Sequence, residues 1–231
     1  MPDHAEIYRQ QAEAYEALVS REDYQGHILP ALESLTALRG RAVVDLGAGT
    51  GRLACLLAPL AASVYAFDLN RAMLAVAAAR LRRSGLAHWT AAVADHRALP
   101  LPDGSADLLV SGWSVSYLAV WNPDDWQAQL ERGLAEMRRL LRPGGSLILL
   151  ETLGTGFTRP SPPAHMHAFL AYLEAHGFRR TWIRTDYRFE DRRQAEELTR
   201  FFFGEELLPK LEERPEGVCL PECTGLWSRT G

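Results

Sequence analysis

Three aspartates stand at the ends of three short apolar segments: Asp45, Asp68 and Asp95. Asp45 opens the run Asp-Leu-Gly-Ala-Gly-Thr-Gly over residues 45–51. Glycines there permit positive φ angles and let a ligand touch the backbone. A helix is expected directly after this run, and the amides at a helix N-terminus favour an anionic group such as a carboxylate. Alternatively, residues 45–51 could form only a tight turn between a strand and a helix, with no ligand. The acid that flanks the glycines makes this alternative less favoured.

The other two aspartates suit the nucleoside part of a ligand. Asp68 follows the second apolar segment, where a carboxylate can accept hydrogen bonds from both hydroxyls of a ribose. It could also cap the helix expected over 71–83, and both roles can hold. Asp95 follows the third segment. Its carboxylate could accept a hydrogen bond from the exocyclic amine of an adenine, or it could be a solvated acid in a loop.

The elements that must position these residues alternate regularly between 41 and 151. Apolar runs predict strands, and segments of helical periodicity predict the helices between them. This order indicates a parallel sheet with right-handed crossovers and helices on both faces, and ligands bind at the carboxyl ends of such strands. The strands are expected over 42–46, 63–67, 87–94, 106–111 and 146–150, and the helices over 53–60, 71–83 and 123–141.

Both ends of the chain depart from this rhythm. Helices are expected over 3–19 and 23–38, then, after the core, a long loop over 152–163. A helix over 164–176, a strand over 178–189, a helix over 193–213 and a last strand over 224–228 complete the chain. We therefore expect one domain over 1–231, with N-terminal helices in 1–39, a cofactor-binding core in 41–151 and an acceptor-side part in 152–231.

Composition restricts the class of protein. The 231 residues are 47% hydrophobic and carry a formal net charge of -4, so no overall basic field favours nucleic acid or anionic lipid. The three cysteines, Cys55, Cys219 and Cys223, are expected to be free thiols, and too few ligands accompany them for a zinc site, so no metal is expected. Neither a signal-peptide core nor a membrane span is apparent, which favours the cytoplasm.

Four segments resemble, in order, the successive motifs of class I S-adenosylmethionine-dependent methyltransferases: VVDLGAGTGR, VYAFDLN, AVADHRALPLPDGSADLLVS and LRPGGSLILLE. The resemblance covers about residues 41–151. It implies an α/β fold with a doubly wound, mostly parallel, seven-stranded Rossmann-like sheet whose last strand is antiparallel. It also implies S-adenosylmethionine as the cofactor, and a methyl group transferred by in-line displacement to an unidentified small-molecule acceptor.

The resemblance assigns roles to individual residues. Gly47, Gly49 and Gly51 would pack against the methionine part of the cofactor, and Asp45 would orient their loop and the amino group. Asp68 would hold the ribose hydroxyls and Asp95 the adenine amine, with the backbone of His96 beside the adenine ring. The cofactor site would further include Tyr15, Leu69 and Ser111. Tyr15, which follows Tyr8 in the leading helix, is similar to aromatic residues that close over the cofactor, although it could equally face the core.

Residues after the fourth and fifth strands are candidates for the acceptor pocket: Trp113, Tyr117 and Glu151. Trp113 could face adenine, the acceptor or the core, and Glu151 could be a base or a structural acid. No general base stands out, so the catalytic residues are unassigned. The segment Ser111-Gly112-Trp113-Ser114 differs from the Asn/Asp-Pro-Pro-aromatic motif of enzymes that methylate amino groups of nucleic acids, which makes nucleic acid an unlikely partner.

Two other functions share parts of this pattern. A nicotinamide-dependent oxidoreductase would use the same loop and strand-two acid, but its G-x-G-x-x-G fingerprint needs glycine at position 52, which is Arg52. A non-catalytic cofactor-binding module would look the same in sequence. The helix over 193–213, with Phe201, Phe202 and Phe203, could be a lid, a packing element or the contact of a homodimer.

Overall fold

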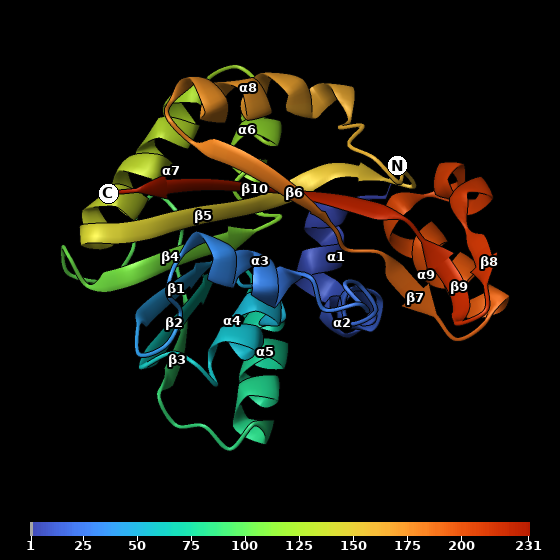
Figure 1. Ribbon diagram of the computed structural model, residues 1–231, viewed down its shortest axis with the longest axis horizontal. Helices are drawn as coiled ribbons and strands as arrows, with labels where there is room; N and C mark the ends of the chain where they lie inside the picture. The colour runs from blue at the N-terminus through green and yellow to red at the C-terminus, as the bar shows by residue number, and fades with distance from the viewer. Residues whose placement is uncertain (1) are drawn as a thin grey trace.

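The computed structural model describes residues 2–231 and shows a seven-stranded sheet between two layers of helices (Figure 1). The strands lie in the order β3-β2-β1-β4-β5-β10-β6. The last strand, β10, runs antiparallel to both of its neighbours, whereas β3, β2, β1, β4 and β5 pair in parallel. The fold class predicted from the sequence is therefore confirmed. The strands span β1 (Ala42–Leu46), β2 (Ser63–Asp68), β3 (Trp89–Val93), β4 (Ala106–Gly112), β5 (Leu141–Thr155), β6 (Arg179–Arg184) and β10 (Glu222–Thr230).

Both faces of the sheet are covered, which explains why the central strands are apolar without alternation. Consecutive residues of a strand point to opposite faces. Val43 joins an apolar cluster with α3 (Ile28–Leu35) and α4 (Arg52–Leu57), while Val44 joins the cluster on the other face with α7 (Trp126–Leu140) and α8 (His167–Ala175). Both valines are fully buried.

The predicted strand over 178–189 is wrong, because the chain changes sheets in its middle. Residues up to Arg184 form β6, and the chain then enters a second, three-stranded sheet of β7 (Tyr187–Phe189), β9 (Gly217–Leu220) and β8 (Glu212–Arg214). Buried Asp186 lies at the junction and binds the side chains of Arg184 and Arg214. The alternation of residue types runs through this junction, so periodicity alone cannot reveal it.

Several other boundaries differ from expectation, including those of the helix expected over 23–38, which is Ile28–Leu35. The helix expected over 193–213 ends at Gly204, whose φ of 91° is in the glycine region, so α9 is Arg192–Phe203, and Pro209 lies in a separate short 3-10 helix, η2 (Glu205–Lys210). The helix expected over 3–19 is interrupted at Gln11 into α1 (His4–Gln10) and α2 (Ala12–Val19). The loop expected from residue 152 begins later, because β5 pairs with β10 as far as Thr155.

Elements from the two ends of the chain meet beside α5 (Arg71–Arg83). Tyr8 of α1 packs with Met73 and Val76 of α5, and Phe202 of α9 lies against the same cluster. Figure 1 shows α1 and α2 between the main sheet and the unit formed by α9, β7, β8 and β9. None of the helices in residues 2–231 has both the length and the apolar composition required to cross a bilayer.

Candidate functional site

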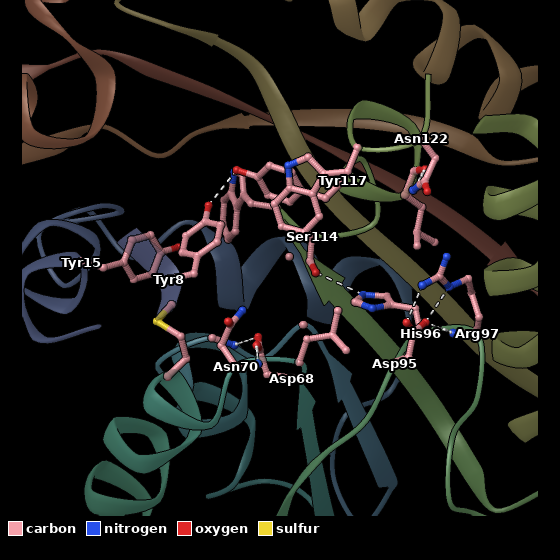
Figure 2. A pocket seen from close by; sticks show the side chains of 18 residues that line it. Tyr8, Tyr15, Asp68, Asn70, Asp95, His96, Arg97, Ser114, Tyr117 and Asn122 are labelled. Atoms are coloured by element: carbon pink, nitrogen blue, oxygen red, sulfur yellow. Dashed lines mark hydrogen bonds and ion pairs between the residues drawn. The ribbon is translucent and has the colours of Figure 1, made fainter. Parts of the chain in front are cut away.

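A pocket lies at the carboxyl ends of β1, β2 and β4, and Figure 2 shows it from close by. Nine of the thirteen site residues named from the sequence line it, which brings residues from five separate segments of the chain together. They are Tyr15, Gly47, Gly49, Asp68, Leu69, Asp95, His96, Trp113 and Tyr117. The other four, Asp45, Gly51, Ser111 and Glu151, lie outside the lining.

The glycine loop forms one wall of the pocket and depends on glycine for its conformation. Gly47 and Gly49 have φ angles of 64° and 53°. A side chain at Gly47 would also collide with Ser114, since a Cβ built there lies 1.7 Å from Ser114 Oγ. Ser114 Oγ is itself within 3.1 Å of His96 Nε2. The loop after β4 therefore rests directly on the backbone of the glycine loop.

Asp68 links this loop to the turn after β2. Its Oδ2 accepts the backbone N–H of Gly49 at 2.9 Å, and its Oδ1 accepts that of Asn70 at 2.7 Å. Burial raises the pKa of the Asp68 carboxyl, and the backbone hydrogen bonds oppose that rise. Each carboxylate oxygen keeps a further lone pair, so Asp68 can accept hydrogen bonds from a ligand while it holds the loop.

Replacement of Asp68 by alanine is expected to weaken cofactor binding by about 1–3 kcal/mol, or roughly fivefold to 150-fold, because a nine-tenths buried acceptor is lost. Calorimetric titration with S-adenosylhomocysteine measures this. Asp103→Ala removes the same charge from an exposed loop and is expected to bind as the native protein does. Equal affinities of the two variants would rule out a role for Asp68 in binding.

Asp95 and His96 lie across the pocket from Tyr8 and Tyr15 (Figure 2). Arg97 binds both oxygens of Asp95, at 2.8 and 2.6 Å, and its hydrogen bonds lower the pKa of that carboxyl. His96 is buried, which lowers the pKa of its imidazole to about 4. It is therefore a neutral ring at physiological pH. Arg97 was not predicted from the sequence, although its position two residues after Asp95 was a usable signal.

Three predicted cofactor residues support the loop from beneath. Asp45 is buried and its Oδ2 accepts the N–H of Ala54 at 2.8 Å, which fixes the first turn of α4. A Cβ at Gly51 would lie 3.0 Å from the Cβ of Ala77, so Gly51 allows α4 and α5 to pack closely. Ser111 Oγ donates to the carbonyl of Leu46 at 2.8 Å and ties β4 to the end of β1.

Trp113 reaches the pocket through an unusual backbone conformation. Its φ is 50°, which is rare for a residue with a side chain, and its N–H donates to Leu150 O at 2.7 Å. The guanidinium of Arg52 lies over its ring, 4.2 Å from the centroid. The sequence left open whether Trp113 faces adenine, the acceptor or the core. In the structure Trp113 is part of the pocket lining and does not lie wholly in the core.

Aromatic side chains form the remaining wall: Tyr8, Tyr15, Trp113, Tyr117 and Trp121. Tyr117 begins α6 (Tyr117–Val120) and stacks on Trp121 with 4.5 Å between ring centroids. Tyr8 meets both Tyr15 and Tyr117 edge-on. Tyr8 and Trp121 were not among the predicted site residues. Spacing places Tyr8 on an apolar helix face but does not show what that face meets.

Glu151 supports the loop that carries Trp113 instead of lining the pocket. Its two oxygens accept the N–H and the Oγ–H of Ser116, each at 2.9 Å. Burial raises the pKa of the Glu151 carboxyl to about 7, against the opposing effect of these hydrogen bonds. Of the two roles open from the sequence, the geometry favours the structural acid.

This pKa predicts a pH dependence of stability. A folded-state pKa of about 7, against an ordinary value of 4.5 for a glutamate carboxyl, means that the folded protein binds the extra proton. The stabilising contribution is complete below about pH 4.5 and is lost as the pH rises to about 7, with a slope of up to roughly 1.4 kcal/mol per pH unit. Glu151→Gln should remove the contribution of Glu151 to this slope. Urea denaturation at several pH values measures it.

Burial also raises the pKa of Asp45 to about 7, so part of the slope should remain in the Glu151→Gln variant. Glu33→Gln, an exposed acid on α3, serves as the control and should leave the curve unchanged. Parallel stability curves for native protein and Glu151→Gln would mean that Glu151 stays ionised in the folded state.

Comparison with known proteins agrees with this arrangement. Residues 44–149 match the family model described as a methyltransferase domain, and this segment contains both the glycine loop and Asp68. Residues 44–149 therefore contain a methyltransferase domain. A similar protein is the ubiquinone/menaquinone biosynthesis C-methyltransferase of Bordetella parapertussis, 32% identical over 174 residues, which cover 70% of this chain and 63% of that protein. The chain thus matches less than two thirds of the length of this relative.

Solved structures of other proteins share the fold of this chain. A putative type II methyltransferase from Anaeromyxobacter dehalogenans aligns with a TM-score of 0.60 at 20% identity, over 91% of this chain and 97% of that one. An S-adenosylmethionine-dependent methyltransferase from Aquifex aeolicus aligns with a TM-score of 0.55 at 16% identity, over 98% and 93% of the two chains. At these identities the likeness concerns the fold.

The pocket has features that fit S-adenosylmethionine. Leu69 is half exposed within it, an apolar surface of the kind that the face of an adenine covers. The backbone of Gly49 is open, since a Cβ built there has only Met73 Cε and Tyr15 Cε1 within 4 Å, at 3.5 and 4.0 Å. Asp68 offers carboxylate lone pairs between these two surfaces. The residues present therefore suit a ligand with an apolar ring, hydroxyl groups and a close backbone contact.

Proposed function

We propose that this protein transfers a methyl group from S-adenosylmethionine to a small-molecule acceptor. The supporting observation is a single pocket with two chemically different walls. One wall consists of the glycine loop, Asp68, Leu69 and Asp95, and the other is aromatic. When bound, the cofactor supplies an electrophilic methyl group on a sulfonium.

The protein's task in such a reaction is mainly alignment. Displacement at the methyl carbon has a neutral leaving group, and holding two reactants in line can contribute about 7–11 kcal/mol in favourable cases. Gly47, Gly49, Asp68 and Asp95 would fix the cofactor. Trp113 and Tyr117 would orient the acceptor beside it. Four residues outside the pocket lining would hold the loops that carry these contacts: Asp45, Gly51, Ser111 and Glu151.

We further propose that the acceptor is a planar ring. Tyr8, Trp113, Tyr117 and Trp121 offer ring faces and edges, which suit another ring in stacked or edge-to-face contact. The name of the Bordetella parapertussis relative refers to quinone biosynthesis and to methylation at carbon, which is consistent with a ring acceptor. The formal net charge of -4 gives no support to a nucleic-acid acceptor.

Two measurements test the function in order. Calorimetric titration with S-adenosylmethionine and with NADH asks which cofactor binds, and we expect only the former. Mass spectrometry then follows S-adenosylhomocysteine and methylated product in reactions with a panel of phenols and hydroquinones. Binding of NADH alone would favour the oxidoreductase alternative. Binding of S-adenosylmethionine with no methyl transfer to any small molecule, protein or RNA would favour a non-catalytic module.

Two expectations from the sequence remain proposals. A homodimer through α9 would have to use surface other than Phe202 and Phe203, whose rings contact Tyr15 and Tyr187 within the chain. Sedimentation analysis tests it. A cytoplasmic location is supported by the cysteines, since Cys55, Cys219 and Cys223 are free thiols in the structure.

A further inference from the structure

A chain of three hydrogen-bonding groups runs from the pocket to the side of α1. Tyr8 Oη and Tyr117 Oη are 2.7 Å apart, and Tyr117 Oη is 3.3 Å from His4 Nδ1. His4 Nε2 is 3.0 Å from the backbone carbonyl of Phe202. Both tyrosines line the pocket, and Figure 2 shows the hydrogen bond between them on the side opposite His96.

The carbonyl at one end fixes the direction of every hydrogen bond in this chain. A carbonyl oxygen only accepts, so His4 Nε2 must carry a proton. Nδ1 of the neutral imidazole then has a lone pair and accepts from the Tyr117 hydroxyl. With its proton directed at His4, Tyr117 accepts from the Tyr8 hydroxyl. The oxygen of Tyr8 therefore presents only lone pairs to the pocket, and a ligand O–H there can donate to it.

We propose that Tyr8, Tyr117 and His4 form a relay that removes a proton from the methyl acceptor. This inference rests on the proposed function and implies an acceptor with an ionisable hydroxyl group. The acceptor O–H gives its proton to Tyr8 Oη as Tyr8 passes its own to Tyr117 and Tyr117 passes its own to His4 Nδ1. The electron pair left on the acceptor forms the new bond to the methyl carbon, and the carbon–sulfur bond breaks with its electrons on sulfur.

After the transfer, every hydrogen bond of the relay is reversed. His4 holds protons on both nitrogens and donates to Tyr117, which donates to Tyr8. His4 is only partly buried, so its extra proton can pass to water and reset the relay. The overall change converts the acceptor O–H and the methyl sulfonium into methylated acceptor, thioether and a released proton, with atoms and charge in balance.

Burial explains why the relay must end at an imidazole. It raises the pKa of Tyr117 to about 12 and also raises the pKa of Tyr8, so neither phenol rests as a phenolate near neutral pH. The titratable groups that face His4 are Tyr8 and Tyr117, and the charges of Asp68 and Glu151 act on these tyrosines. Imidazole is a common general base and proton shuttle in enzymes.

Packing from the far end of the chain holds His4 in place. Its ring stacks on Phe202 of α9 with 4.4 Å between centroids and an interplanar angle of 10°. The same phenylalanine supplies the carbonyl that fixes the tautomer. Of the roles that the sequence left open for this segment, α9 therefore acts here as a packing element that positions His4.

Nitrogen NMR of the His4 imidazole tests the relay in the protein without ligands. The His4 signals are assigned by their loss in His4→Gln. We expect protonated Nε2 and unprotonated, hydrogen-bonded Nδ1, and we expect Tyr117→Phe to shift the Nδ1 signal toward that of a free imidazole nitrogen. A proton on Nδ1 in the neutral ring would overturn the proposal, as would a signal unchanged by Tyr117→Phe.

Kinetics test the catalytic consequence with 1,4-dihydroxynaphthalene under anaerobic conditions as the acceptor probe. His4→Gln, Tyr117→Phe and Tyr8→Phe are each expected to lower the single-turnover rate by about 10²-fold or more, the usual contribution of a base, with cofactor affinity changed less than threefold. Added imidazole should partly restore a His4→Gly variant. Tyr172→Phe and His176→Gln remove the same atoms from a stacked Tyr–His pair at the C-terminal end of α8 and should leave the rate unchanged.

The two arms separate failure of the relay from failure of the proposed function. Full activity in the three variants would overturn the relay and leave methyl transfer standing. No methyl transfer by the native protein to this probe would count against a phenolic acceptor, and the NMR result would still decide whether the His4 tautomer needed for the relay exists.

Discussion

Replacement of Gly47 by alanine is expected to destabilise the protein by about 2–5 kcal/mol and to reduce cofactor affinity at least a hundredfold. The positive φ of Gly47 costs an alanine about 1–2 kcal/mol. Overlap of the new methyl group with Ser114 Oγ, at 1.7 Å, adds about 1–3 kcal/mol as the loop or Ser114 moves. Either movement displaces backbone that lines the pocket. Thermal denaturation and titration with S-adenosylhomocysteine measure the two effects.

Two other glycines provide matched controls for this variant. Gly85 has a φ of 73° but no atom within 4 Å of a built Cβ, so Gly85→Ala should show the conformational cost alone and normal affinity. Gly49→Ala has ordinary contacts, but its methyl group would enter the pocket, so affinity should fall more than stability. If Gly47→Ala and Gly85→Ala were equally stable, the contact with Ser114 would be unimportant.

Replacement of Arg52 by methionine is expected to destabilise the protein by about 3–5 kcal/mol, because it leaves a buried carboxylate without its partner. Arg52 Nη1 lies 2.5 Å from Glu22 Oε2, and the two side chains are 17% and 3% exposed. Tyr187 and Thr185 also donate to Glu22, at 2.8 and 3.0 Å, but they bring no charge. Methionine keeps apolar contact with the ring of Trp113. Urea denaturation measures the loss.

A second substitution separates charge from packing in this experiment. Glu22→Gln combined with Arg52→Met removes both charges and should recover most of the lost stability, since the penalty comes from the unpaired ion. Arg138→Met breaks a pair with Glu131 in which both side chains are more than a third exposed, and should change stability by less than about 1 kcal/mol. A double variant as unstable as Arg52→Met would attribute the loss to packing.

The cofactor half of the pocket follows from local sequence signals. The length and the periodicity of the apolar segments identify the strands, and the parallel arrangement brings the carboxyl ends of these strands to one edge of the sheet. Asp68, Leu69 and Asp95 therefore could be placed together before any coordinates. The spacing of residues in the sequence cannot distinguish a residue that lines the pocket from one that lies just beneath the lining. Asp45 and Ser111 stand at strand ends too, but they point into the structure.

The aromatic half could not be predicted in the same way. His4, Tyr8 and Tyr117 come together through contacts between residues more than a hundred positions apart. An amphipathic helix shows that one face is covered, but its period carries no information on the partner. The second sheet was missed for a related reason, since Thr185 and Asp186 are polar residues that are buried only because Glu22, Arg184 and Glu222 surround them.

The contact between His4 and Phe202 joins residues 198 positions apart. Contacts of such long range form late in folding, because a large loop must close before they contribute. During synthesis, β1, β2 and their glycine loop emerge well before α9, and earlier segments generally fold first. A nascent chain can therefore acquire the nucleoside half of the pocket while it still lacks an ordered His4. Competence for proton removal would then be the last property that the growing polypeptide gains.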